Sequence, residues 1–150
     1  MPPEESGLKL INPDMPGYVR TMVHGDYAAS VAVEARLDAA GWDGFPRFLA
    51  ALFFLAVDRR FGTTADRAEV IMFVAELRAS LGEGGPAIDV EAAEALILTT
   101  IDPSGDYSAS QEMIGRIQAA TIQKVLTDDD LTDAELDALL AEAVELAQRD

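Results

Sequence analysis

A single histidine, His24, is the natural candidate for a general base near neutral pH. It stands in the segment Val23-His24-Gly25-Asp26, where the carboxylate of Asp26 could orient its imidazole ring. No residue of the sequence is marked out as the nucleophile that such a pair would activate. One histidine also excludes a metal site built from several histidines. We therefore interpret His24 as a loop residue beside a helix cap.

Two acidic loops contain carboxylates from which a calcium site could be built. The loop Asp102-Pro103-Ser104-Gly105-Asp106 has side-chain oxygens at alternate positions. An EF-hand loop, however, requires glycine at its sixth position and glutamate at its twelfth, and these positions are occupied by Tyr107 and Met113. The run Asp128-Asp129-Asp130 precedes an expected helix start, where the helix dipole stabilises negative charge. We expect neither a metal nor any other cofactor.

Other catalytic motifs are missing from the sequence. The glycines of Gly82-Glu83-Gly84-Gly85-Pro86 are not followed by the lysine and hydroxyl residue of a phosphate-binding loop. The chain has no cysteine, which excludes thiol catalysis, disulfides and Cys-ligated metals. Carboxylate pairs such as Glu91 with Glu94 are numerous, but acid–base catalysis requires two carboxylates in different environments. We therefore favour a protein that is not an enzyme, and an enzyme that uses carboxylates, alone or with a divalent metal, is the lesser alternative.

Negative charge dominates the composition and is concentrated in the second half of the chain. The sequence has 27 acidic and 11 basic residues, a net charge of −16. Residues 76–150 contain 17 acidic and 4 basic residues, whereas residues 1–75 contain 10 and 7. Such a charge repels phosphate groups, so we expect neither nucleic acid nor a membrane as a partner. It complements a basic protein, although solubility or a high-salt cytoplasm would also explain it.

Size and hydropathy predict a soluble domain that builds its own core. The chain has 150 residues, of which 49% are hydrophobic. Its longest apolar run, Phe48–Val57, is 10 residues long, and a membrane-spanning helix needs about 20. The segment Met1–Ser6 is polar and acidic, unlike a signal peptide. We expect a cytoplasmic protein, and the preference for arginine and alanine suits a GC-rich bacterial genome.

The order of helix breakers and caps predicts an all-α protein, a single compact bundle of about six helices. Residues 1–25 hold four prolines and three glycines, so we expect an irregular N-terminal arm there. Within the arm, Leu8–Ile11 and Tyr18–Val23 could pair as a short β-hairpin. Residues 26–150 should form the helical domain. Helix starts are expected at Asp26, Phe45, Thr63 or Thr64, Asp89, about Ser108, and Thr132.

Four details of this helical prediction can be tested directly. Thr132 and Glu135 should form a capping box, in which each side chain accepts from the backbone N–H of the other residue. Asp66 should lie in the first turn of the third helix, and Gly82–Pro86 should be a loop. The second helix, from Phe45 to Arg60 before Gly62, is apolar nearly all round, so we expect it to be central.

An apolar central helix has to be enclosed by other helices, by a second copy in a homodimer, or by a ligand. The third case would give a pocket between the two phenylalanine-rich helices, lined by Phe48, Leu52, Phe73 and Leu77. The chain would then be a sensor or carrier of an apolar small molecule.

The leading hypothesis is a non-enzymatic bacterial interaction protein whose acidic surface takes a basic protein partner. An immunity protein, an antitoxin or an adaptor would fit this description. The expected contact residues are the carboxylates around the last helix: Asp128, Asp129, Asp130, Asp133, Asp137, Glu142 and Glu145.

Overall fold

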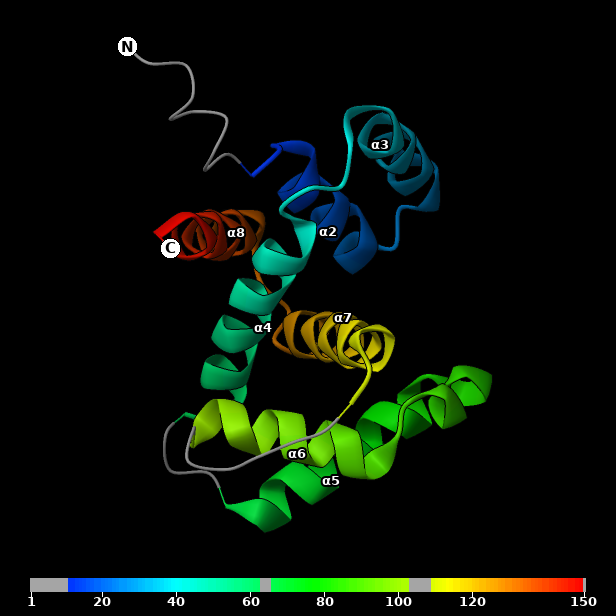
Figure 1. Cartoon of the computed structure of the whole chain (residues 1–150), viewed down its shortest axis with the longest axis vertical. Helices are drawn as coiled ribbons and strands as arrows, with labels where there is room; N and C mark the ends of the chain where they lie inside the picture. The colour runs from blue at the N-terminus through cyan, green and yellow to red at the C-terminus, as the bar shows by residue number, and fades with distance from the viewer. Residues whose placement is uncertain (1–10, 63–65, 103–108, 150) are drawn as a thin grey trace. The chain divides into compact units, whose positions relative to one another are not determined.

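The computed structural model describes residues 11–62, 66–102 and 109–149, and within these ranges its regular structure is entirely helical (Figure 1). Seven α-helices, α2 to α8, and one 3-10 helix, η1, lie in the described residues. The all-α class is confirmed, with one α-helix more than the expected six. None of the described helices is both long enough and apolar enough to cross a membrane.

The chain divides into two compact units instead of the single bundle that we expected. Unit 1 comprises Met1–Leu52 and Asp129–Asp150, and unit 2 comprises Phe53–Asp128. The boundary falls inside helix α4, so this helix contributes its first half to unit 1 and its second half to unit 2.

Helix α2 (Asp14–His24) corrects the prediction that residues 1–25 are irregular and that Tyr18–Val23 is extended. Asn12 accepts two hydrogen bonds at the start of the helix, from the backbone N–H groups of Asp14 and Met15. Pro16 stands in the first turn, where a missing N–H costs little. Met15 and Val19 are buried, and burial of an apolar face outweighs weak helix propensity. The other half of the expected hairpin, apart from Ile11, lies outside the described residues.

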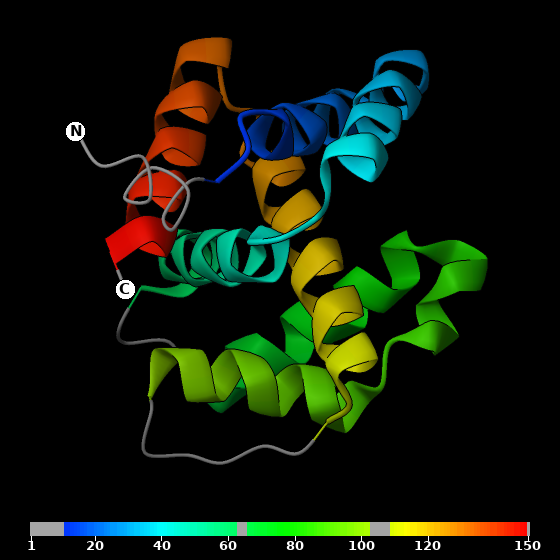
Figure 2. The same cartoon turned by 45° about the horizontal axis from the view of Figure 1, so that its top comes forward.

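Unit 1 is built around α2, with α3 (Tyr27–Ala40) lying against it. The predicted cap of α3 is confirmed, because Asp26 accepts a hydrogen bond of 3.1 Å from the backbone N–H of Ala29. Helix α8 (Asp133–Arg149) also packs against α2 (Figure 2). It begins with the predicted capping box, whose two bonds between Thr132 and Glu135 measure 2.9 and 3.1 Å.

The hydrophobic residues of unit 1 that are buried come from all four of its helices and from the segment before α2. They are Ile11, Met15, Val19, Val33, Leu37, Phe48, Leu49, Ala51, Leu52, Leu136, Leu140, Ala143 and Ala147.

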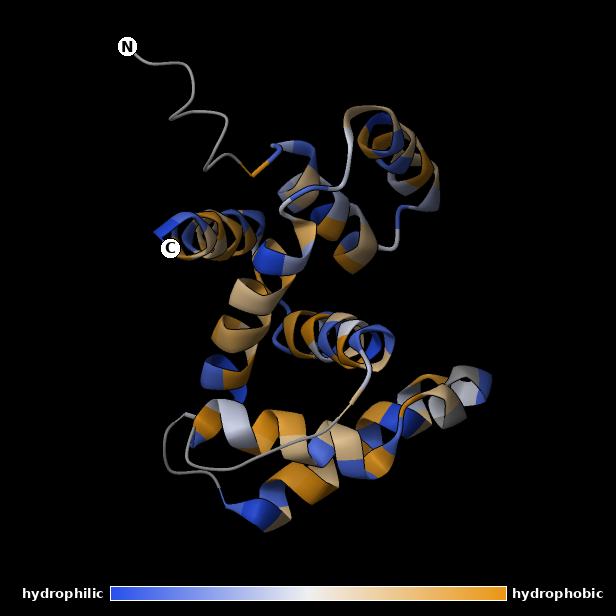
Figure 3. Cartoon of the chain, viewed as in Figure 1, coloured by the Kyte–Doolittle hydropathy of each residue, from blue (hydrophilic) through white to orange (hydrophobic). Residues whose placement is uncertain are grey.

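Helix α4 (Phe45–Phe61) starts at Phe45 as the sequence predicted and ends one residue beyond the expected Arg60. It is hydrophobic through its middle and hydrophilic near both ends (Figure 3). The prediction that the helix is enclosed on every side is only partly right, because the side chain of Phe54 is 47% exposed.

Unit 2 contains α5 (Arg67–Ser80), η1 (Gly82–Ala87), α6 (Val90–Ile101) and α7 (Gln111–Asp128). Asp66 is the cap of α5 and forms a capping box with Glu69, so its predicted place inside the first turn was wrong. Thr63 and Thr64, the expected caps, lie outside the described residues. Asp89 caps α6 as predicted, and the expected loop at Gly82–Pro86 is η1.

The turn from α5 through η1 depends on a close approach of two backbone segments. A Cβ atom at Gly85 would lie 2.3 Å from the carbonyl oxygen of Arg78, which leaves room for glycine alone. The Nε–H of Arg78 then donates to the carbonyl oxygens of Gly85, at 3.2 Å, and Ile88, at 3.0 Å. The side chain of Arg78 therefore stabilises the turn that follows α5, and the backbone of the same residue makes the close approach to Gly85.

The core of unit 2 includes one polar side chain. Thr121 is fully buried, and its hydroxyl makes no hydrogen bond within the described residues. The buried hydrophobic residues are Phe53, Ala56, Val57, Phe61, Val70, Phe73, Val74, Leu77, Ile88, Ala92, Ala93, Leu96, Ile97, Ile117, Ile122, Val125 and Leu126.

Candidate interaction surfaces

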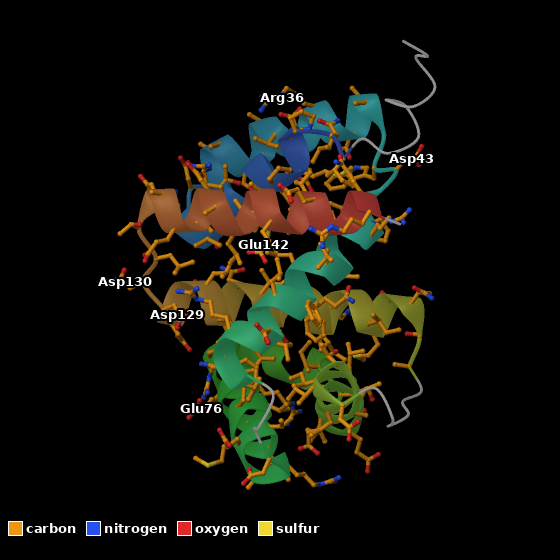
Figure 4. The ribbon with its side chains drawn as sticks, turned by 90° about the vertical axis from the view of Figure 1, so that its left-hand side faces the viewer. Arg36, Asp43, Glu76, Asp129, Asp130 and Glu142 are labelled. Atoms are coloured by element: carbon orange, nitrogen blue, oxygen red, sulfur yellow. The ribbon has the colours of Figure 1, made fainter. Side chains whose placement is uncertain are left out.

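The carboxylates that we predicted as a partner surface are all exposed. Between residues 128 and 149 the chain has eight acidic side chains and one basic side chain, Arg149. Asp129 and Asp130 lie at the turn before α8, and Glu142 lies on α8 itself (Figure 4). Asp130 has a φ of 50°, a left-handed conformation that aspartate tolerates better than most residues, so it also has a role in shaping the turn.

Two of the predicted carboxylates connect α8 to α2. Asp137 forms an ion pair with Arg20, and Asp133 lies 3.4 Å from Nε2 of His24. Both pairs are open to solvent, so each stabilises the unit by at most about 1 kcal/mol. The structure thus gives Asp133 and Asp137 a role inside unit 1 that the sequence did not indicate.

The partner of His24 differs from the one suggested by the sequence. His24 is the last residue of α2 and faces Asp133, while the carboxylate of Asp26 caps α3. The structure therefore does not show His24 as a base that Asp26 orients.

The other predicted carboxylates differ in how they are compensated. Asp128, in unit 2, lies 2.9 Å from Nζ of Lys124, and Glu145 lies 3.9 Å from Arg149. Asp130 and Glu142 form no ion pair within the described residues. Unit 1 as a whole has 15 acidic and 5 basic residues, a net charge of −10, so pairing leaves its surface strongly negative.

A second feature of unit 1 is an aromatic cluster, formed by Tyr18 of α2, Trp42 before α4 and Phe45 at the start of α4. The ring centroid of Trp42 is 5.7 Å from that of Tyr18 and 5.0 Å from that of Phe45, and both contacts are edge to face. Such pairs stabilise by about 0.5–1.5 kcal/mol beyond the area that they bury. All three rings are partly exposed. The sequence analysis missed this cluster, because its members come from three different segments.

Negative charge surrounds the aromatic cluster. The indole Nε1–H of Trp42 donates to Oδ1 of Asp38 at 2.7 Å. Burial raises the pKa of the Tyr18 phenol above its ordinary value, and the charges of Glu34 and Asp38 raise it further. Two carboxylates of α3 therefore interact with the aromatic cluster: Asp38 through a hydrogen bond to Trp42, and Glu34 and Asp38 through their charge on Tyr18. Asp43, in the loop between α3 and α4, is a further exposed carboxylate beside Trp42 (Figure 4).

Helix α3 also exposes apolar side chains, near its N-terminal end. Val33 and Leu37 are its buried residues, and they face the rest of unit 1. Tyr27, 83% exposed, and Val31, 64% exposed, lie one turn apart on the opposite half of the helix. Alanines fill most of the remaining positions of that half. An exposed apolar helix face of this kind is typical of an interaction site.

Unit 2 has an open groove of about 290 Å³ between α5 and α7. Leu77 of α5 and Leu81, the residue after this helix, form part of its apolar wall, and Lys124 and Asp128 of α7 form part of its polar rim. Of the residues predicted to line a ligand pocket, Leu77 lies in this groove and Phe73 packs against Phe61 at 5.2 Å. Phe48 and Leu52 belong to unit 1, and all four predicted pocket residues are buried.

No group of three or more potential metal ligands occurs in the part of the chain that the structure describes. The chain matches no known protein-family model, and no curated protein or solved structure is significantly similar to it.

Proposed function

We propose that this chain is a binding protein whose acidic surface in unit 1 takes a basic protein partner. One observation supports the proposal most directly: the carboxylates from Asp129 to Glu145 are all exposed, and they outnumber the cations that lie beside them. The most specific form of this function is an immunity protein or antitoxin. Such a protein would cover the cationic nucleic-acid site of a bacterial toxin. An adaptor would use the same surface.

Electrostatics determines how such a surface would work. A strongly negative face raises the rate at which a basic partner is encountered, and the effect weakens as salt screens the charges. Asp130 and Glu142 should contribute most per residue, because binding through them breaks no ion pair within unit 1. Asp137 would have to share its charge with Arg20, and Asp133 already lies beside His24.

An affinity pull-down from the native lysate, performed at low and at high salt, tests this function. We expect a specific basic protein that binds at low salt and is lost at high salt. The variant Glu142→Lys/Glu145→Lys should abolish its capture. The control variant Glu76→Lys/Glu83→Lys changes the net charge by the same amount on exposed residues of unit 2. It should retain the partner.

Two results would contradict the proposal. If both variants lose the partner equally, only the net charge of the protein matters. If no partner is captured at either salt concentration, the acidic residues serve solubility alone. The groove between α5 and α7 would then be the better starting point, and binding of an apolar small molecule would be the function to pursue.

A further inference from the structure

The aromatic cluster of unit 1 combines two features that bind cations. The faces of tyrosine, tryptophan and phenylalanine rings attract a positive charge, and tryptophan does so most strongly. Three such rings meet here, with centroids 5.0–6.3 Å apart, and each is partly exposed to solvent. Because the rings touch one another, a cation has to bind on the outer side of the cluster and not between the rings.

The carboxylates beside the cluster have no cation of their own. Neither Glu34 nor Asp38 forms an ion pair within the described residues, and Asp38 instead accepts the indole N–H of Trp42. Arg36, which lies between them in sequence, extends to Asp14 of α2, with two bonds of 3.3 Å. Asp38 therefore contacts the aromatic cluster without an ion-pair partner, and Glu34, one helical turn earlier on α3, is a second uncompensated carboxylate.

We propose that Trp42, Tyr18 and Phe45, together with Glu34 and Asp38, form a binding site for an arginine side chain of the basic partner. This inference rests on the proposed function and names the chemistry of one contact. A guanidinium group fits better than an ammonium group, because it is planar, stacks on aromatic faces and donates to carboxylates through several N–H groups. Asp38 keeps a second carboxylate oxygen for this purpose, and Glu34 keeps both.

The exposed face of α3 indicates what surrounds that arginine. Tyr27 and Val31 lie on the same helix as Glu34 and Asp38 and offer apolar contact N-terminal to the carboxylates. The surface is thus apolar at one end and acidic and aromatic at the other. An amphipathic segment of a basic protein, with apolar residues on one side of the arginine, complements both parts.

The single tryptophan of the chain is a built-in reporter for this site, because Trp42 is the source of all tryptophan fluorescence. The probes are two peptides of equal charge, acetylated and amidated hexaarginine and hexalysine, titrated into the full-length protein. We expect hexaarginine to change the fluorescence of Trp42 and to bind several times more tightly than hexalysine. Added salt should weaken both peptides.

Charge-matched variants separate the site from the general acidity of the protein. The variant Glu34→Gln/Asp38→Asn keeps side chains of the same shape, and an asparagine oxygen still accepts from Trp42. It should lower the affinity for hexaarginine roughly tenfold. The variant Glu76→Gln/Glu83→Gln removes the same charge from unit 2 and should change the affinity less than twofold. Calorimetry on Trp42→Phe, which keeps an aromatic ring, should show a smaller loss than the first variant.

Three outcomes would overturn the arginine site: equal losses in the two double variants, equal affinity for the two peptides, or hexaarginine binding without any change in Trp42 fluorescence. Failure of the site is distinguishable from failure of the proposed function. If the site is wrong and the function is right, the native partner still depends on Glu142 and Glu145. If the function is wrong, hexaarginine still responds to Glu34 and Asp38 although no native partner is captured.

Discussion

The two units of this chain use their few basic side chains in different ways. In unit 1, Arg20 pairs with Asp137 and Arg36 pairs with Asp14, so basic residues connect one helix to another. In unit 2, Arg116 pairs with Glu112 one turn away on the same helix, while the guanidinium of Arg60 lies over the rings of Phe61 and Phe73 at 5.2 and 5.5 Å. Two ion pairs thus join helices in unit 1, which also has one pair within α8, between Glu145 and Arg149. In unit 2, Arg116 and Lys124 pair within α7, and Arg60 covers aromatic rings.

The aromatic residues show the same contrast. Phe61 and Phe73 are buried in unit 2 and pack edge to face. Tyr18, Trp42 and Phe45 of unit 1 make similar ring contacts but remain partly exposed beside carboxylates. Similar ring geometry therefore belongs to the interior in unit 2 and to a partly exposed surface in unit 1.

The largest effect that distinguishes the units should come from removing one ring from each. Phe73→Ala should lower the free energy of unfolding by about 3–5 kcal/mol, because it empties a buried site. Phe45→Ala should cost only about 1–2 kcal/mol, since its ring is already partly exposed. Urea denaturation of both variants measures the difference. Equal losses would show that the aromatic cluster of unit 1 is core and not surface.

A smaller effect should follow from Gly85→Ala in unit 2. The new Cβ would meet a backbone oxygen at 2.3 Å, and a backbone atom cannot move aside as a side chain can, so we expect a loss of about 2–3 kcal/mol. Gly115→Ala is the matched control, because a Cβ there meets nothing within 4 Å and Gly115 lies inside α7. That control should gain about 0.5–1 kcal/mol in a thermal melt. If Gly85→Ala leaves the free energy of unfolding unchanged, then the backbone of η1 rearranges easily.

The smallest effect concerns the ion pairs themselves. A double-mutant cycle on Arg20 and Asp137 should give a coupling energy of about 0.5–1 kcal/mol, and one on Arg116 and Glu112 about 0.3–0.5 kcal/mol. Both couplings should shrink in high salt. If the pair between α2 and α8 proves no stronger than the pair within α7, then ion pairs do not hold the helices of unit 1 together.

Local signals in the sequence were sufficient for most helix ends. Asp26, Asp89 and the pair Thr132–Glu135 act through hydrogen bonds to backbone N–H groups within three residues, so their role can be predicted without the rest of the fold. Asp66 was assigned to the wrong position because neighbouring Thr63 and Thr64 are equally suitable caps by type.

Helix α2 could not be predicted in this way. The prolines and glycines around it suggested irregular structure, although Pro13 and Pro16 stand at the helix start, where proline is tolerated. The burial of Met15 and Val19 stabilises the helix through contacts that the local sequence does not show. The exposure of Phe54 could not be predicted from the local sequence either, because its apolar neighbours on α4 suggest a buried position although its side chain is exposed.

The amino-acid sequence by itself determined the helical class, most helix boundaries, the absence of cysteine chemistry and the large negative charge, because each of these depends on residue type or on neighbours a few positions away. The tertiary structure decided which carboxylates are paired, where glycine is obligatory and which rings form the aromatic cluster. These features join residues such as Tyr18 with Trp42, Arg20 with Asp137 and Arg78 with Gly85, and no local pattern encodes contacts that exist only after helices have packed.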